Sequence, residues 1–294
     1  MPITLPAQLD EATIYRGVTV VPLFPRRDPA AAYTTLAGAL RRGLEVTEKG
    51  SGGSVPELLV TNPLVERVLL YDGEELLGAK QNRILNLTVL LAEASVTPIP
   101  VSCVEAGRWR RRSATFAAAA HTAGPELRLR KARALGEDAL ARGVAQQEVW
   151  QAVAEQAGRR GVDSPTAAHA DMFVHHEAGL AELRDAFPAR PGQCGVILVL
   201  PDGRVCLDYL SRPDAYAEHH RKLIDGYLMD ALDQLDRPAA GIEPAHRLLH
   251  RLSLVSASHR ASAGLGIDLR VTTKSVAATG LELEGEILQL SAYA

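Results

Sequence analysis

The sequence has little of what several common protein classes need. Among its 294 residues only three are cysteine, two are tryptophan and four are phenylalanine. The cysteines, Cys103, Cys194 and Cys206, are odd in number and widely spaced, which excludes an even disulfide framework and a metal-knuckle pattern. So few aromatic side chains make it difficult to build a sheet that stacks the bases of single-stranded nucleic acid.

A strong charge of one sign and a long apolar run are also missing. The formal net charge is -3, so no overall basic surface drives non-specific binding to nucleic acid, although Arg108 and Arg110 to Arg112 are crowded together. No run approaches the length of a membrane span, and the first residues lack the basic-then-apolar pattern of a secretory signal. We therefore expect a cytoplasmic protein with reduced thiols and no membrane partner.

The familiar motifs of nucleotide binding and nucleophilic catalysis are absent. Gly73 and Gly78 form neither a P-loop nor a dinucleotide fingerprint, and no Gly-x-Ser-x-Gly elbow occurs. The cofactor, if there is one, is unknown from the sequence.

The nine histidines offer no recognisable metal motif. His246 and His250 have i, i+4 spacing, but the glutamate of a zincin helix is not between them and no third ligand can be named. The adjacent pairs at 175–176 and 219–220 point apart on a helix. The sequence therefore predicts no metal site, and the histidines are expected to lie exposed on amphipathic helices.

What the chain does contain is typical of a folded protein with a sizeable core, since 47% of its residues are hydrophobic and 23% are charged. Short β-branched segments separated by turns fill the first part, and an Ala-, Arg- and Glu-rich composition follows from Ala114. Pro188 and Pro191-Gly192 mark the clearest boundary. We predict an α+β fold with an antiparallel β-sandwich-like lobe (1–112), a helical segment (113–190) and a mixed α/β lobe (191–294), as separate lobes or as one compact unit.

Several elements can be predicted individually. Asp72-Gly73 predicts a hairpin, and residues 84–91 alternate as one strand. Pro98 and Pro100 place the strand over 97–105 at a sheet edge or bulge. A second hairpin is expected around 201–203, helices over 33–42, 127–142, 146–160, 164–187, 213–235 and 244–256, and strands over 269–272, 280–283 and 286–291.

The segment from Tyr71 to Trp109 is unusually dense in side chains that could carry chemistry. Glu74 and Glu75 follow the Asp-Gly turn, and strand alternation directs one of the two carboxylates to the interior, where it needs a partner or a raised pKa. Lys80 and Arg83 could be that partner. The alternative is a solvated hairpin with structural ion pairs.

A second carboxylate in this segment lies beside a thiol. Strand alternation puts Cys103 and Glu105 on one face of the strand. They could act as nucleophile and base, or Glu105 could be an acid-base group beside an incidental cysteine. A buried cysteine is more often part of the packing, and no histidine is near in the sequence to activate it. We therefore favour Glu105 over Cys103.

The polar loop that follows offers donors for phosphate or carboxylate oxygens. Amides there could orient a ligand, and the indole of Trp109 could stack on it. The candidate catalytic residues are Glu105, Glu75 and Cys103, and the candidate substrate-binding residues are Glu74, Lys80, Gln81, Asn82, Arg83, Asn86, Arg108 and Trp109.

Two stretches, GEELLGAKQNRILN (73–86) and IPVSCVEAGRW (99–109), resemble the ARG and rhodanese-phosphatase-superfamily-associated proteins, a prokaryotic family of unknown function. Similarity continues through 127–131, 147–150, 164–166, 195–197 and 264–270, and so covers most of the chain. The resemblance implies gene association with ADP-ribosylglycohydrolases and rhodanese-like phosphatases, in contexts of nucleotide metabolism and RNA repair. The chain departs from the family pattern at Ile267, where an acidic residue is expected.

Two hypotheses follow for the function. In the first, the protein is an enzyme or a binder that acts on a phosphorylated nucleotide-like or RNA-related substrate. In the second, it is a non-catalytic module that self-associates, and amides such as Asn82 and Asn86 cap loops and satisfy backbone groups. A concave pocket lined by the candidate residues would favour the first hypothesis, and a fully packed cluster the second.

Overall fold

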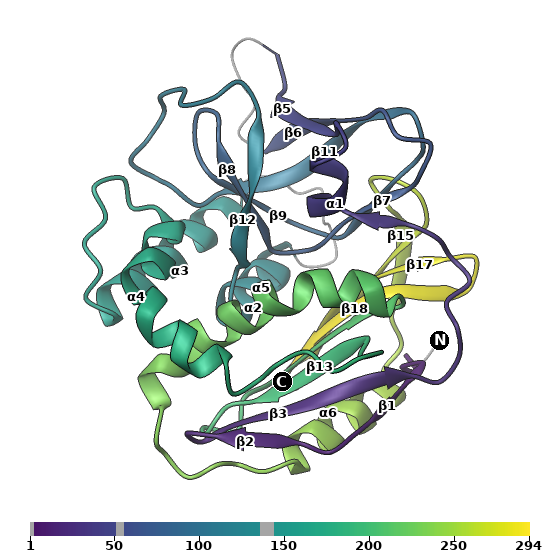
Figure 1. The fold of residues 1–294 in the computed structure, drawn as a ribbon, viewed down its shortest axis with the longest axis vertical. Coiled ribbons are helices and arrows are strands. Elements are labelled where there is room, and N and C mark those ends of the chain that lie inside the picture. The colour runs from purple at the N-terminus through teal and green to yellow at the C-terminus, as the bar shows by residue number, and fades with distance from the viewer. Residues whose placement is uncertain (1–2, 51–55, 136–143) are drawn as a thin grey trace. The chain divides into compact units, whose positions relative to one another are not determined.

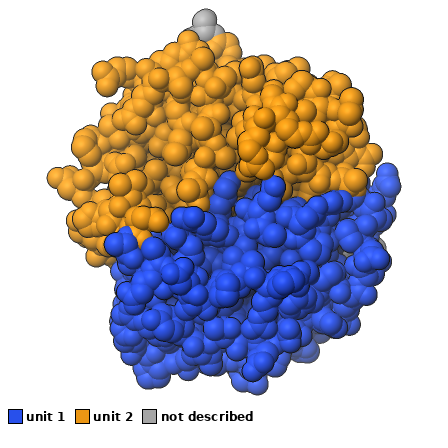
Figure 2. Space-filling view, viewed as in Figure 1, with its two compact units in different colours: residues 1–31, 178–261, 266–294 blue, residues 32–177, 262–265 orange. Residues whose placement is uncertain are grey.

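The computed structural model describes residues 3–50, 56–135 and 144–294 (Figure 1). Strands and helices both occur, which confirms the α+β class. The chain divides into two compact units: unit 1 comprises Met1–Ala31, Ala178–Ala261 and Gly266–Ala294, and unit 2 comprises Ala32–Glu177 and Ser262–Leu265 (Figure 2). This division differs from the three consecutive segments predicted from the sequence, because the first 31 residues join the C-terminal part. No helix in the described part of the chain is both long and apolar enough to span a membrane.

Unit 1 is built on a nine-stranded antiparallel sheet. Its order is β1-β3-β13-β14-β18-β17-β16-β15, and β2 pairs with β3. Figure 1 shows β3 beside β13, which explains why the N-terminal residues belong to this unit. The strands are β1 (Ala7–Leu9), β2 (Thr13–Tyr15), β3 (Val18–Pro25), β13 (Gly195–Val199), β14 (Val205–Leu210), β15 (Ser258–Ala261), β16 (Ile267–Thr272), β17 (Ala277–Leu283) and β18 (Glu286–Tyr293).

The predicted hairpin and helices of this unit are confirmed. Val199 pairs with Val205 across the turn that holds Gly203, whose φ is 86°. The helices are α5 (Pro213–Ala231), continued by the 3-10 turn η1 (Leu232–Gln234), and α6 (Glu243–Leu254). The core includes Leu248 and Leu252 of α6 together with sheet residues such as Ile197.

The expectation that the histidines are exposed is wrong for His219 and His220, which are buried on α5. His219 Nδ1 is 3.1 Å from the carbonyl oxygen of Ala215. The two ring nitrogens of His220 contact the Tyr216 hydroxyl and the Phe187 carbonyl oxygen. Burial of His220 is tolerated because both of its ring nitrogens find hydrogen-bond partners inside the unit.

Unit 2 holds two sheets. The six-stranded sheet has the order β12-β8-β9-β11-β6-β5, and its two edge strands, β12 and β5, approach each other. The three-stranded sheet has the order β10-β7-β4, in which β4 and β7 are parallel. The strands are β4 (Thr34–Thr35), β5 (Glu45–Glu48), β6 (Glu57–Asn62), β7 (Val68–Leu70), β8 (Glu74–Gly78), β9 (Arg83–Leu85), β10 (Val89–Leu91), β11 (Ser95–Cys103) and β12 (Phe116–Thr122). A sandwich-like packing of this lobe stays a prediction.

The predicted hairpin at Asp72-Gly73 is wrong. The turn exists, since Glu74 N donates to Tyr71 O over 3.1 Å and Gly73 has a φ of 84°. However, β7 and β8, which it connects, belong to different sheets. An Asp-Gly hairpin turn needs positive φ at both central residues, and Asp72 does not have it, so the turn passes the chain from one sheet to the other.

Two strand predictions also need correction. Residues 84–91 are not one strand, because β9 and β10 lie in different sheets. The strand with the two prolines is not an edge strand, because β11 lies between β9 and β6. Its proline-bearing half, however, pairs only with β6 among the described residues, and pairing with β9 begins at Val101. The missing N–H groups of Pro98 and Pro100 therefore cost no ladder hydrogen bond.

In unit 2 the helices expected over 33–42 and 164–187 are shorter than predicted, and the helix expected over 146–160 is confirmed. Thr35 caps α1 by accepting from Gly38 N, and residues 34–35 form β4. The expected helix over 127–142 begins at Pro125, and its residues 136–142 lie outside the described residues. The helices are α1 (Leu36–Leu40), α2 (Pro125–Leu135), α3 (Val144–Arg159) and α4 (His169–Arg184), the last of which continues into unit 1.

Candidate functional site

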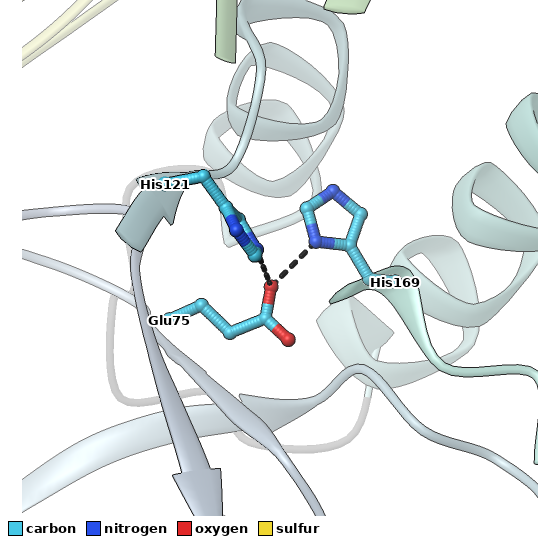
Figure 3. Close-up of side chains that lie close together, drawn as sticks. All are labelled: Glu75, His121 and His169. Atoms are coloured by element: carbon cyan, nitrogen blue, oxygen red, sulfur yellow. Dashed lines mark hydrogen bonds and ion pairs between the residues drawn. The ribbon is translucent and has the colours of Figure 1, made fainter. Parts of the chain in front are cut away.

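Three buried side chains of unit 2 meet in one place: Glu75 of β8, His121 of β12 and His169, the first residue of α4 (Figure 3). We call them the Glu75 cluster. His121 Nε2 is 2.9 Å and His169 Nδ1 is 2.6 Å from the same atom, Glu75 Oε2. These residues could hold a metal ion, because one ligand atom of each lies within 4.8 Å of the others.

A β-bulge brings His121 to Glu75. In the pairing of β12 with β8, Ala118 is opposite Leu76 and Thr122 is opposite Glu74. Residues 119–121 therefore lie opposite Glu75 alone. The extra residues change the direction of the end of β12. Bulges of this kind are frequent beside active sites because they turn a side chain out of the regular alternation.

A clamp at the end of β11 fixes His169. Its backbone N donates to Val104 O over 2.8 Å, and Ala168 forms a β-bridge with Glu105. Gly107 N donates to Thr166 O over 2.8 Å. The predicted helix start at residue 164 is wrong, because residues 164–168 are held in this clamp and α4 begins only at His169.

Glu105 is the centre of that clamp. Its carboxylate forms a two-pronged ion pair with Arg108, with contacts of 2.7 Å to Nε and 2.6 Å to Nη2. It also accepts from the Thr166 hydroxyl over 2.8 Å and from Asn82 N over 3.1 Å. Burial alone would raise the pKa of Glu105. The hydrogen bonds from Arg108, Thr166 and Asn82 lower the pKa by more than burial raises it, so the pKa is below its ordinary value. The hydrogen bonds leave little of this carboxylate available for proton transfer.

Arg108 is equally engaged. Besides Glu105, its guanidinium donates to the carbonyl oxygens of Gly78, Ala79 and Arg110 and to Asn82 Oδ1. Gln81 belongs to the same group of contacts, because its Nε2 donates to Glu105 O over 2.9 Å. The structure thus brings four of the predicted residues together: Gln81, Asn82, Glu105 and Arg108.

Glu75 is ionised in the interior. Burial alone would raise its pKa, but the attraction to His169 and the hydrogen bonds from His121 and His169 hold the pKa at about 2. An ionised carboxylate can only accept, so both imidazoles donate to it. Its second oxygen, Oε1, is buried and has no hydrogen-bond partner among the residues that the structure describes. A buried acceptor left in this way needs an explanation, because it is costly for stability.

The aromatic ring of Phe173 packs against one side of the Glu75 cluster. The ring of Phe173 stacks on His121 with centroids 3.7 Å apart and planes 7° from parallel. It meets His169 edge-on, with centroids 5.2 Å apart. Phe173 lies one turn after His169 on α4, so the same helix supplies one imidazole and the support for the other.

Lys80, Arg83 and Trp109 form a second group, which a hydrogen bond from Arg83 to Gln81 joins to the first. Lys80 Nζ and the Arg83 guanidinium carbon lie 5.2 Å and 5.8 Å from the centroid of the Trp109 ring. Trp109 is 50% exposed, whereas Arg83 is wholly buried and donates to Gln81 Oε1. Of the three, Lys80 and Trp109 are the ones that a ligand in solvent could reach.

The remaining predicted residues lie in local hydrogen-bond networks. Cys103 is buried, which raises the pKa of its thiol to about 11. The side chain of Gln146 bridges the backbone of Cys103, donating to its O and accepting from its N. Glu74 Oε2 accepts from Tyr71 N, and Asn86 Oδ1 accepts from the Ser102 hydroxyl.

His121 and His169 were missed from the sequence. They are 46 and 94 residues from Glu75, and no periodic signal joins them. The alanine-rich run before His121 has a helical composition but forms the strand β12. Only a knowledge of the strand pairing and of the β12 bulge would have placed these imidazoles beside the carboxylate.

Comparison with known proteins identifies a family and no individual relative. Searches of curated proteins and of solved structures find no match to the chain. The model of the ARG and Rhodanese-Phosphatase-superfamily-associated Protein domain matches residues 6–293. That match spans both units and all three residues of the Glu75 cluster, so the chain belongs to this family.

Proposed function

We propose that unit 2 carries the reaction centre of a hydrolytic enzyme, and that this centre is the Glu75 cluster. The observation that carries the proposal is the convergence of two imidazoles on one buried, ionised carboxylate oxygen. Groups with perturbed pKa values that are held by specific charge partners gather at functional sites.

The carboxylate fixes the tautomer of both rings. His121 donates from Nε2 and His169 from Nδ1, so in the neutral imidazoles the lone pairs are on His121 Nδ1 and His169 Nε2. An imidazole oriented by a carboxylate is suited to act as a general base. In this role it takes a proton from water as the water oxygen bonds to the substrate, and it returns the proton to the leaving group as that bond breaks.

The substrate class that we propose is phosphorylated and nucleotide-like or RNA-related. Membership of a family named for its association with rhodanese-phosphatase proteins supports this class. The accessible pair of Lys80 and Trp109 supports it too, because a cation and a stacking face suit a phosphate and a base. Glu105 and Arg108 then act as positioning residues that hold the loop before His169.

A second candidate function is a non-catalytic interaction module that self-associates. The observation in its favour is the saturation of the Glu105 and Arg108 side chains by hydrogen bonds within the unit, as expected of a buttress. This candidate predicts that loss of the imidazoles affects stability alone.

The test is a hydrolysis screen of purified protein against nucleotides, ADP-ribose and short RNA, with His121→Gln and His169→Gln as variants. We expect each variant to lose roughly a hundredfold or more of the turnover, the usual contribution of an oriented acid-base group. The matched control is the double variant His246→Gln, His250→Gln, which changes two exposed histidines on α6. Unchanged turnover in folded His121 and His169 variants overturns the assignment of the centre. Absence of turnover on every substrate class overturns the proposal of a hydrolase and leaves the interaction module.

A further inference from the structure

We infer that the Glu75 cluster binds one divalent transition-metal ion, with His121 Nε2, His169 Nδ1 and the Glu75 carboxylate as its ligands. The inference rests on the proposed function in one respect, namely that the ion sits at the proposed reaction centre. Binding of the ion can be measured without any substrate.

The geometry needs shifts of up to about 1.5 Å between ligand atoms to admit an ion. The two imidazole nitrogens are 2.9 Å and 2.6 Å from Glu75 Oε2, and one ligand atom of each residue lies within 4.8 Å of the others. Zinc–ligand bonds of about 2.1 Å in a tetrahedral arrangement separate the ligand atoms by roughly 3.4 Å. The two short contacts therefore lengthen by about half to three-quarters of an ångström when the ion replaces the hydrogens between the atoms.

The chemistry of the ligand atoms selects the kind of ion. Two imidazoles and one carboxylate form the ligand set of catalytic zinc sites and of non-haem iron(II) sites. Mg²⁺ and Ca²⁺ prefer oxygen ligands throughout, so they are poor candidates. Among the described residues no fourth histidine, cysteine or carboxylate joins this group, so positions on the ion remain for water and substrate.

The orphaned oxygen of Glu75 is the second observation that points to a ligand. Oε1 is buried in the interior and receives no hydrogen bond from the described part of the chain, although both imidazoles are close to the other oxygen. A cation between the three side chains would satisfy the carboxylate by direct coordination, through one oxygen or both. The loss of stability caused by the unpartnered Oε1 then arises because this oxygen is held in position to bind the ion.

The surroundings hold the ligand atoms in place. Phe173 stacks on the ring of His121 and restricts its rotation. The backbone contact of His169 with Val104, and the Glu105 clamp before it, fix the start of α4. Such supporting contacts orient the ligands of metal sites.

Binding requires a change of tautomer. In the metal-free protein the hydrogens lie on His121 Nε2 and His169 Nδ1, and in the metal-bound form the remaining hydrogens lie on His121 Nδ1 and His169 Nε2. The bound ion lowers the pKa of a water in its open position. With the ion bound, water activation passes from the imidazole proposed above as the general base to the ion, and both imidazoles serve as its ligands.

The first experiment uses the full chain without a histidine tag, stripped with a chelator and then titrated with Zn²⁺, Co²⁺ or Mg²⁺. We expect one Zn²⁺ or Co²⁺ per chain, a ligand-field spectrum of tetrahedral or five-coordinate Co²⁺, and no Mg²⁺ binding. Absence of stoichiometric Zn²⁺ and Co²⁺ binding overturns the inference.

Variants place the ion. His121→Gln, His169→Gln and Glu75→Gln should each lower Zn²⁺ affinity by at least about a hundredfold, which exceeds the usual upper effect of a supporting residue. The double variant His246→Gln, His250→Gln should keep wild-type affinity, since it removes exposed imidazoles with i, i+4 spacing. Equal loss in that control, or no loss in the cluster variants, overturns the assignment. If a cluster variant fails to fold, the imidazole NMR signals of the wild type provide the readout, and those of His121 and His169 must shift on adding Zn²⁺.

The outcomes separate the inference from the proposed function. Turnover that survives complete removal of metal but disappears in His169→Gln overturns the metal site and leaves the hydrolase. Stoichiometric metal at the cluster without turnover on any substrate class overturns the hydrolase and leaves the metal site.

Discussion

The hydroxyl of Thr166 donates to the same Glu105 carboxylate that receives the Arg108 guanidinium, at 2.8 Å from Oε1. Thr166 is three residues before His169, so this hydrogen bond links a structural ion pair to the start of α4 and to an imidazole of the Glu75 cluster. In the proposed function, Glu105, which the sequence favoured as an acid-base group, therefore has a task one step removed from the chemistry, that of positioning.

The first prediction tests this positioning. Thr166→Val removes one partly buried hydrogen bond and should cost about 1 kcal/mol of unfolding free energy. Because the lost contact is next to His169, we expect the imidazole NMR signals of His169 to shift more than those of His121. A merely structural role moves the urea midpoint and leaves the His169 signals unchanged. Thr61→Val, at an exposed position of β6, is the matched control.

The second prediction concerns the ion pair itself. Glu105→Gln leaves the buried Arg108 without its counter-charge and should lower the unfolding free energy by about 3–5 kcal/mol. The loss should exceed that of Thr166→Val clearly in urea denaturation. A loss equal to or smaller than that of Thr166→Val would show that the Glu105–Arg108 pair is not the centre of the clamp.

The third prediction is a pH dependence set by His220. Its Nε2 faces the carbonyl oxygen of Phe187 and therefore donates, so Nδ1 accepts from the Tyr216 hydroxyl and the ring is neutral. Burial lowers the pKa of His220 below 6.5. Below that pH the unfolded chain binds a proton that the folded chain does not, so stability is present above pH 6.5 and decreases as the pH falls through the lowered value. His220→Gln should flatten this decrease between pH 7 and pH 5.5 in urea titrations, and exposed His246→Gln should leave it unchanged.

The fourth prediction concerns the thiols. Burial raises the pKa of Cys103 to about 11 and that of Cys194 to about 12. Both therefore stay protonated in the folded protein at pH 8 and should react with a thiol reagent only on unfolding, as should the buried Cys206. Because the folded-state values are raised, stability should fall as the pH rises through the unfolded value near 9. Rapid labelling of Cys103 in the native protein would instead support a reactive thiol.

The fifth prediction separates backbone strain from steric contact at the turn before Glu75. Gly73 has a φ of 84°, and a Cβ there would lie 2.7 Å from Arg128 Cδ. Gly192 has a φ of 79°, and a Cβ there would meet nothing within 4 Å. Gly192→Ala should cost about 1–2 kcal/mol for the left-handed conformation alone, and Gly73→Ala distinctly more. Equal losses in thermal unfolding would show that Arg128 moves aside freely.

Sequence reasoning succeeded where local chemistry decides the structure. The turn at Gly203 and helices α5 and α6 follow from residues a few positions apart, and they lie close to where they were predicted. It failed where distant partners decide. The Asp72-Gly73 turn forms, but the strands on its two sides are taken by different sheets.

The candidate site shows the same limit. Strand alternation and the turn signal indicated Glu75 as a candidate. The residues that contact its carboxylate, His121 and His169, come from a bulge in β12 and from the first position of α4. The polar loop of Lys80 to Arg83 has a high density of donors, yet its chain folds into two groups, one around Arg108 and one around Trp109. Spacing along a chain cannot distinguish such groups, because long-range pairing sets which neighbours each side chain meets.

The strand order of unit 1 has a consequence for biosynthesis. β3 is made before most of unit 2, but its partner β13 follows about 170 residues later, and β14 waits for β18. Most of unit 2 is encoded between them, in one continuous stretch from Ala32 to Glu177. As the chain leaves the ribosome, the apolar β3 remains without its sheet while the residues of unit 2 emerge, and pairings so distant in sequence form slowly. We therefore expect a chaperone to bind the β3 segment of the nascent chain while unit 2 emerges.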